Sequence, residues 1–145
     1  MNLLENDITD PNFINDLIPQ KRPFVMVDKL FCFSQNKIVS GLTISEDNLF
    51  TENTVFEAAG LIENMAQTIA LHTGYSYYLK KEPAPTGYIG AIKKVVIDKL
   101  PSVGQELVTT VNILHDIMGV TMVSASVECE EIVIATSEMK TVLAN

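Results

Sequence analysis

The stretch AAGLIENMAQTIAL, residues 58–71, decides the fold of this chain. In an α-helix its apolar side chains cover nearly the whole circumference, so little of that helix can face water. Thr54 and Glu57, just before it, have the spacing of a capping box and predict that the helix begins there, and Gly74 predicts its end. A helix of this composition needs cover on all sides, which predicts that it lies at the centre of the domain.

Strand-forming stretches rich in β-branched and aromatic residues flank this central helix. They predict strands at residues 24–33, 37–45, 88–97, 106–115, 120–129 and 132–143. A short helix is expected before them, because Asp10 and Pro11 fit the N-cap and first helical positions and Pro19 stops the helical pattern. This order predicts an α+β fold in which one antiparallel sheet wraps around one long buried helix.

Length, charge and cysteine content narrow the class of protein. The 145 residues fit a single domain, expected to span residues 1–145. Ten basic and eighteen acidic residues give a net charge of −8, which repels nucleic acids and anionic membranes, so neither is expected as a partner. Two separated cysteines, an acidic amino terminus and the lack of a long apolar run predict a cytoplasmic protein. The edge strands of the sheet need partners, which favours a homodimer.

Glu63 is the first candidate for chemistry, because a carboxylate inside an apolar helix costs free energy unless it has a partner or faces a cleft. Gln67 follows four residues later, about 40° further round the helix, so one cavity can contain both side chains. The alternative is structural. Glu63 then makes a hydrogen bond within the fold or faces solvent at a dimer seam.

Neither histidine is expected to join Glu63 within one chain. His72 falls about 180° away on the same helix and is expected to be structural. His115, which precedes Asp116, is expected at the surface. The sequence has no nucleophile elbow, no glycine-rich phosphate loop and no spaced His or Cys ligand set, so we expect no cofactor and no metal.

Three segments together resemble one family. Residues 17–30, LIPQKRPFVMVDKL, resemble the opening LLPHRxPFLLVDRV of the hot-dog-fold 3-hydroxyacyl-acyl carrier protein dehydratases of fatty acid synthesis. Residues 61–67, LIENMAQ, are similar to the helix segment LILEALAQ of that family. Residues 87–92 and 101–107 are similar to its sheet strand and its PxxxGDxL turn. The resemblance covers nearly the whole chain and implies a hot-dog fold.

The resemblance also implies the residues of a site. Glu63 carries over as the catalytic acid or base, and a backbone amide of residues 58–60 at the helix start is expected to hold the thioester carbonyl. An acyl carrier protein or coenzyme A thioester is implied as the partner. The clustered basic residues available to a carrier protein are Lys21–Arg22, Lys80–Lys81 and Lys93–Lys94. The residues expected to contact the substrate are Gln67, Leu49, Phe50, Ala59, Gly60 and Gly90.

The chain departs from the family pattern at three places. Leu49 stands where the family has its catalytic histidine, and Gln20 replaces the histidine of the PHR motif. Glu57 and Ala58 replace the Pro-Gly that precedes the family helix. The chain therefore resembles a divergent branch, similar to the dehydratase-like proteins of aryl-polyene and flexirubin pigment pathways.

Three functions stay open on the sequence. The first is a (3R)-hydroxyacyl thioester dehydratase of fatty acid or polyene lipid biosynthesis that works without the family histidine, for which Glu63 and Gln67 are retained. The second is a hot-dog acyl thioesterase, in which the same carboxylate activates water. The third is a non-catalytic subunit that binds acyl thioesters and partners an active homologue.

Overall fold

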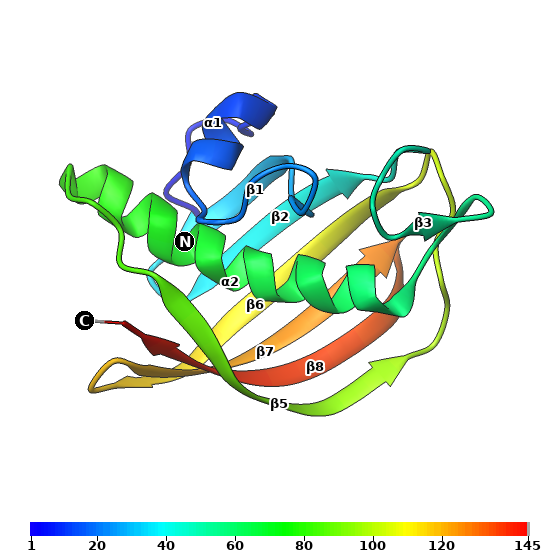
Figure 1. The fold of residues 1–145 in the computed structure, drawn as a ribbon. Coiled ribbons are helices and arrows are strands. Elements are labelled where there is room, and N and C mark those ends of the chain that lie inside the picture. Colours follow the sequence, from blue (N-terminus) through cyan, green and yellow to red (C-terminus); the bar gives the residue numbers. More distant parts are fainter. Residues whose placement is uncertain (145) are drawn as a thin grey trace.

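The computed structural model describes residues 1–144 and places one long helix, α2, across the concave face of a six-stranded antiparallel sheet (Figure 1). The strand order is β1-β2-β6-β7-β8-β5, and β3 and β4 form a separate small hairpin. The predicted fold class, an antiparallel sheet around one central helix, is confirmed. The elements are α1 (Pro11–Asp16), β1 (Lys29–Ser34), β2 (Lys37–Thr43), β3 (Thr51–Glu52), β4 (Val55–Phe56), α2 (Ala58–Lys80), β5 (Gly87–Ile97), β6 (Glu106–Ile117), β7 (Val120–Cys129) and β8 (Ile132–Leu143).

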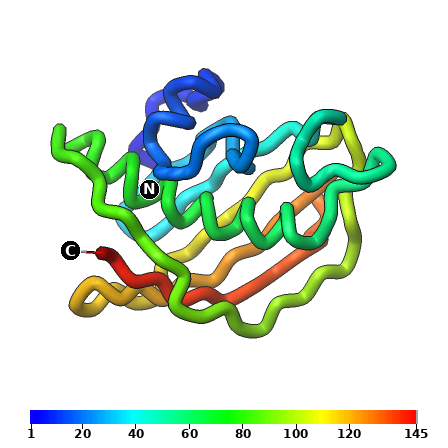
Figure 2. The backbone as a smooth tube through the Cα atoms, in the orientation of Figure 1, coloured from blue at the N-terminus to red at the C-terminus, as the bar shows by residue number. Residues whose placement is uncertain are grey.

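The hydrophobic core fills the space between α2 and the sheet, and Figure 2 shows the helix lying across the strands, with its last turns projecting beyond them. Leu61, Met65 and Leu71 of α2 are fully buried in it. Burial of side chains of this size stabilises a fold by about 1.5–3 kcal/mol each. The sheet side of the core includes Ile38, Val111, Val123, Val127, Ile134 and Met139.

Buried polar side chains fix the position of α2 on the sheet. Thr109 of β6 donates its hydroxyl to Asn64 Oδ1 at 2.6 Å, and the hydroxyls of Ser40 in β2 and Thr68 in α2 lie 2.7 Å apart. All four side chains are buried. Because a buried polar group is costly without its partner, these pairs favour one register of the helix over its neighbours.

The short helix predicted after Asp10 is confirmed. Asp10 Oδ1 accepts a hydrogen bond from the Asn12 amide at 3.0 Å, and Pro11 holds the first helical position. The helix ends at Asp16, before the predicted stop at Pro19. The chain then turns to run along α2.

The first strand is shorter than predicted. β1 begins at Lys29, so residues 24–28 of the predicted strand 24–33 are irregular. The reason is that side chains of α2, rather than a neighbouring strand, bind the backbone groups of Phe24 and Met26. This segment therefore lies on the helix, where it forms one wall of the candidate site.

The capping box predicted at Thr54 is wrong. Val55–Phe56 forms β4, which pairs with Thr51–Glu52, and α2 begins only at Ala58. Glu57 is the N-cap residue but makes no side-chain capping hydrogen bond. The backbone carbonyl of Thr54 instead accepts a hydrogen bond from the loop before β6. Contacts with distant parts of the chain thus override the local helix-start signal.

The predicted helix end at Gly74 is also wrong, because α2 continues to Lys80. Lys81 then ends it in a left-handed conformation, with φ of 58°. Gly74 lies inside the helix, and the backbone oxygen of Leu17 packs where a β-carbon would stand. The glycine therefore permits a close approach of two backbones rather than a change of chain direction.

The four strands after α2 lie within two residues of their predicted bounds. β5 is an edge strand that pairs only with β8, and nearly all of its residues are exposed. An edge strand of this length leaves a row of backbone N–H and C=O groups without partners. Its exposed apolar side chains are Tyr88, Ile89, Ile92, Val95 and Val96.

Candidate active site

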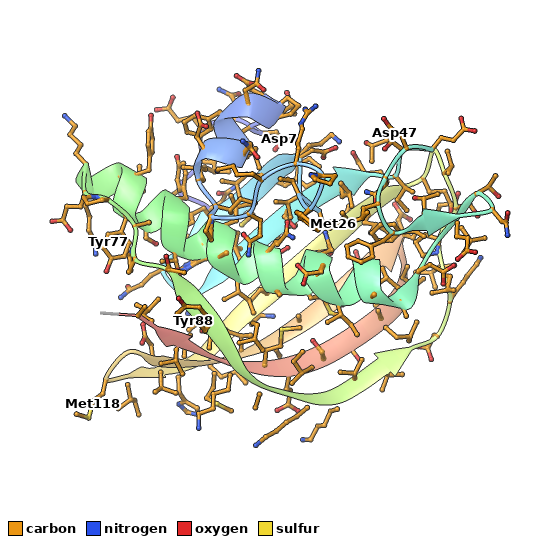
Figure 3. All side chains as sticks on the ribbon, viewed as in Figure 1. Asp7, Met26, Asp47, Tyr77, Tyr88 and Met118 are labelled. Atoms are coloured by element: carbon orange, nitrogen blue, oxygen red, sulfur yellow. The ribbon has the colours of Figure 1, made fainter. Side chains whose placement is uncertain are left out.

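Two side chains of α2 hold the segment Phe24–Met26 against the helix. Gln67 Oε1 accepts from the Met26 amide at 2.6 Å, and Gln67 Nε2 donates to the Phe24 carbonyl at 2.8 Å. Asn64 Nδ2 donates to the Met26 carbonyl at 2.8 Å. Figure 3 shows Met26 beside the middle of α2. Asn64 is not among the site residues predicted from the sequence, although a second amide in an apolar helix is the signal that points to such contacts.

Glu63 lies one turn before Gln67 and is held by it. Gln67 Nε2 donates to Glu63 Oε2 at 3.0 Å, so the predicted shared face of these two side chains is confirmed. Glu63 is half-buried. No other group within residues 1–144 forms a hydrogen bond or ion pair with its carboxylate. The second oxygen of Glu63 is therefore available to a ligand.

The segment around Leu49 reaches the same region through Met26. Asn48 Nδ2 contacts Met26 Sδ at 3.4 Å, and Asn48 Oδ1 accepts from the Phe50 amide at 2.9 Å. Leu49 is 48% exposed, whereas Phe50 packs against the core. Leu49 thus adds apolar surface and no group that can transfer a proton.

The start of α2 offers two free backbone donors. The Gly60 amide donates to the Glu57 carbonyl at 2.9 Å, whereas the amides of Ala58 and Ala59 have no acceptor among residues 1–144. Ala59 is exposed, and Gly60 is buried against the ring of Phe56, with no room for a β-carbon. Of the three amides expected at this helix start, those of Ala58 and Ala59 can bind an oxygen. They lie at the positive end of the helix dipole.

Gly90 lies apart from these residues. It is exposed on β5, at an irregularity in the pairing with β8, and its nearest neighbours are Lys140 and Val142. Within one chain the structure does not bring Gly90 together with Glu63.

Both histidines lie away from Glu63. The His72 ring stacks on Phe33 with centroids 5.0 Å apart, and its Nε2 lies 2.8 Å from the Ser34 carbonyl oxygen. Burial lowers the pKa of His72 below its usual 6.5, and the backbone contacts oppose this shift. His115 is exposed on β6. Both predictions are confirmed: His72 is structural, and His115 lies at the surface. Within the described chain, neither imidazole is part of the candidate site.

A cavity of about 260 Å³ lies beside the turns of α2 that follow Glu63. Its walls come from α2, from the segment that links α1 to Phe24, from the start of β5 with the segment before it, and from the end of β8. Tyr88, labelled in Figure 3 at the start of β5, lies on this side. The lining residues include Asp16, Gln20, Ala66, Ala70, Thr73 and Thr86.

Residues 1–144 contain no cluster of three or more His, Cys, Asp or Glu side chains of the kind that holds a metal ion. Cys32 and Cys129 are free thiols. None of the helices in this range is long and apolar enough to cross a membrane.

Comparison with known proteins places this geometry in a family. The 3-hydroxyacyl-[acyl-carrier-protein] dehydratase FabZ of Vibrio atlanticus is 26% identical over 137 residues, which cover 88% of each chain. The same enzyme of Aliivibrio fischeri is 24% identical over 142 residues, 94% of each chain. Among solved structures, the dehydratase heterocomplex ApeI:P from Xenorhabdus doucetiae contains a chain with the same fold. It matches with a TM-score of 0.84 at 21% identity, over 91% of each chain.

These similarities bear out the hot-dog fold and the dehydratase resemblance, including the link to aryl-polyene pathway proteins. The match to a single family extends over residues 13–145, which include Glu63, Gln67 and the residues that line the cavity. The chain belongs to the ApeP-like family, the ApeP dehydratases.

Proposed function

We propose that this chain dehydrates (3R)-hydroxyacyl thioesters of acyl carrier protein or coenzyme A in the cytoplasm, with Glu63 as acid and base. The observation that carries the proposal is the Glu63 carboxylate, which is fixed through one oxygen by Gln67 at 3.0 Å and free at the other. The family and the FabZ relatives support the same reaction class. The cavity beside the next helical turn supplies room for an acyl chain.

Dehydration removes a proton from C2 and the hydroxyl from C3, forms the C2=C3 double bond and releases water. Glu63 accepts the C2 proton as a base and, once protonated, gives it to the departing hydroxyl as an acid, which requires both groups on one face of the substrate. The negative charge that develops on the thioester oxygen is stabilised by the free amides of Ala58 and Ala59. Gln67 positions the carboxylate rather than binding substrate, because both of its amide hydrogens are already used.

The site within residues 1–144 of one chain has no second proton-transfer group beside Glu63, so a second arrangement of the site involves another chain. Leu49 stands at the histidine position, and neither His72 nor His115 serves Glu63. In the predicted homodimer the second copy has leucine at the same position. The similar structure from Xenorhabdus doucetiae is a dehydratase heterocomplex. It supports a second arrangement, in which a different, histidine-bearing chain pairs with this one and completes the site.

The basic side chains that could bind an acidic carrier protein differ in whether they already have a partner within the chain. Lys21 donates to two backbone carbonyls at the end of α1, Lys94 pairs with a carboxylate of β8 at 2.9 Å, and Lys80 lies over an aromatic ring. Arg22 forms no ion pair within residues 1–144 and stands two residues before Phe24, close to the candidate site. Of the predicted clusters, Arg22 is the residue we assign to the phosphate of the substrate arm.

The proposal is tested by mass spectrometry of a trans-2-enoyl carrier protein incubated with wild type or Glu63→Gln. Wild type is expected to add one water to the intact thioester, and the variant to react at least about 100-fold more slowly, because the essential proton-transfer group is gone. Glu82→Gln is the matched control, because Glu82 is an exposed carboxylate just beyond α2.

Other outcomes would replace the proposal. Release of free acid would identify a thioesterase. An unchanged thioester with wild type alone, but hydration once a histidine-bearing homologue is added, would identify a partner subunit. Equal activity of Glu63→Gln and wild type would remove Glu63 from the chemistry.

A further inference from the structure

Asn64 is a buried polar side chain beside Glu63 to which the proposed reaction gives no role. It follows Glu63 directly in α2, and none of its surface is exposed to solvent. In the helix segment LILEALAQ of the resembled family, alanine follows the glutamate, so the amide is a feature of this chain. A buried amide costs free energy unless its polar atoms have partners. The contacts of Asn64 therefore indicate what the residue does.

The Asn64 amide joins the sheet to the segment Phe24–Met26. Its Nδ2 atom donates to the Met26 carbonyl at 2.8 Å, and its Oδ1 atom accepts from the Thr109 hydroxyl at 2.6 Å. This orientation is the only one that satisfies both partners, because a carbonyl accepts and never donates. Thr109 is fully buried in β6, which lies between β2 and β7 inside the sheet. Asn64 thus ties the segment to an interior strand.

Gln67 binds the other polar group of the same backbone residue. Asn64 holds the Met26 carbonyl, whereas Gln67 Oε1 accepts from the Met26 amide at 2.6 Å. Gln67 Nε2 then donates to Glu63 Oε2 at 3.0 Å. The bonds form one continuous hydrogen-bond path from Thr109 to Glu63, and every donor along this path points toward the carboxylate. Hydrogen bonds aligned in one direction polarise and strengthen one another.

Met26 also supports the loop on the other side of the candidate site. Its side chain is fully buried, and its sulfur atom contacts Asn48 Nδ2 at 3.4 Å. Leu49 follows Asn48 directly in the chain. A change in the position of Met26 therefore reaches both Glu63, through Gln67, and the loop that carries Leu49.

We propose that Asn64, anchored by Thr109, is a positioning residue that sets the orientation of the Glu63 carboxylate through Met26 and Gln67. The inference rests on the proposed function, in which one carboxylate accepts the C2 proton and then donates to the C3 hydroxyl. Such a group has to reach two atoms of the substrate in turn, and a small displacement of a reacting group lowers the rate steeply. The hydrogen-bond path links its orientation to the sheet.

A second buried hydrogen bond between α2 and the sheet provides a matched control. The hydroxyls of Ser40 in β2 and Thr68 in α2 lie 2.7 Å apart. Thr68 donates its one hydroxyl hydrogen to the Asn64 carbonyl, so Ser40 is the donor in this pair. The Ser40 hydroxyl is not part of the hydrogen-bond path to Glu63. Ser40→Ala therefore removes a buried bond between helix and sheet and leaves the path intact.

The first test measures hydration of a trans-2-enoyl carrier protein by Asn64→Ala and Ser40→Ala. Asn64→Ala is expected to lower kcat at least about tenfold with KM within about twofold of wild type, because substrate binds but the carboxylate is misplaced. Ser40→Ala is expected to keep kcat within about twofold of wild type, although both variants unfold at a lower urea concentration. Equal losses of kcat in the two variants would overturn the proposal, since Asn64 would then only stabilise the fold.

Thr109 provides a second pair of variants should Asn64→Ala fail to fold. Thr109→Val removes the hydroxyl at nearly constant volume, whereas Thr109→Ser keeps the donor to Asn64 Oδ1. The valine variant is expected to lose at least about fivefold in kcat, and the serine variant to stay within about twofold of wild type. The same kcat in both variants would overturn the anchoring of Asn64 by the sheet.

Hydrogen exchange separates failure of this inference from failure of the proposed function, because it requires no turnover. The exchange rate of the Met26 amide, measured by NMR relative to the amides of β6 and β7, reports local opening of this segment. Asn64→Ala is expected to raise this relative rate at least about tenfold, and Ser40→Ala to leave it unchanged. That result supports the proposal even where wild type hydrates nothing. A relative rate that stays unchanged in Asn64→Ala would overturn it, even where Glu63→Gln abolishes activity.

Discussion

Gln67 has both of its amide hydrogens in hydrogen bonds within the chain, one to Glu63 and one to the Phe24 carbonyl. The spacing of the sequence predicts the contact with Glu63, because residues four apart on a helix face the same way. It does not predict the bonds to Phe24 and Met26, which join positions 43 and 41 residues apart in the sequence. The irregular segment 24–28 has no periodicity that would indicate its neighbour.

Replacing Gln67 by leucine tests its positioning role. The free energy of unfolding is expected to fall by about 1–3 kcal/mol, because the buried amide of Met26 loses its acceptor. The kcat for enoyl thioester hydration is expected to fall with little change in KM, because Glu63 loses its fixed orientation. Urea unfolding and steady-state kinetics measure the two effects, with exposed Gln35→Leu as the control. A folded variant with unchanged kcat would show that Gln67 does not position Glu63.

The helix α2 shows what an element's own sequence determines and what it does not. Its long apolar pattern predicts a buried central helix, because burial on many successive turns leaves a clear signal. Both ends differ from the prediction. Thr54 and Phe56 form backbone hydrogen bonds with the loop before β6 instead of a capping box, and Gly74 lies inside the helix against Leu17. A contact with a distant segment determines where each end lies. The local capping and helix-ending residues give no indication of such a contact.

The substitution Gly74→Ala tests the close contact with Leu17. In an exposed helix alanine is more stable than glycine by about 1 kcal/mol. Here we expect a loss of about 1–3 kcal/mol, because the new β-carbon meets the Leu17 backbone oxygen. Thermal and urea unfolding provide the measurement, and Ser76→Ala on the next part of the helix is the control. A transition midpoint equal to or above that of wild type would mean that the two backbones are not in close contact.

At the scale of the whole molecule, the two edge strands of the sheet differ in whether another segment of the chain covers them. At the β1 edge the N-terminal segment bonds the strand, through a bridge between Ile8 and Leu30 and a bond from Leu3 to Phe33. The β5 edge has no such cover among residues 1–144. The sequence predicts that the sheet needs a partner, but only the strand order identifies which edge is open. The residue that completes proton transfer at Glu63 must also come from outside the chain if it is an imidazole.

We therefore expect pairing through β5 and propose a double substitution, Ile92→Lys with Val96→Lys, to test it. Wild type is expected to sediment as a dimer at micromolar concentration. The variant is expected to be a monomer, because charges on an edge strand oppose its pairing with another strand. Met118→Lys is the matched control, since Met118 is 97% exposed at the turn between β6 and β7 (Figure 3), beyond the end of the sheet and not level with Ile92 or Val96. A dimer that survives the double substitution would place the interface elsewhere. Wild type could instead be a monomer that binds a histidine-bearing homologue. If the double variant does not bind that homologue, the β5 edge is the site of a heterologous partner.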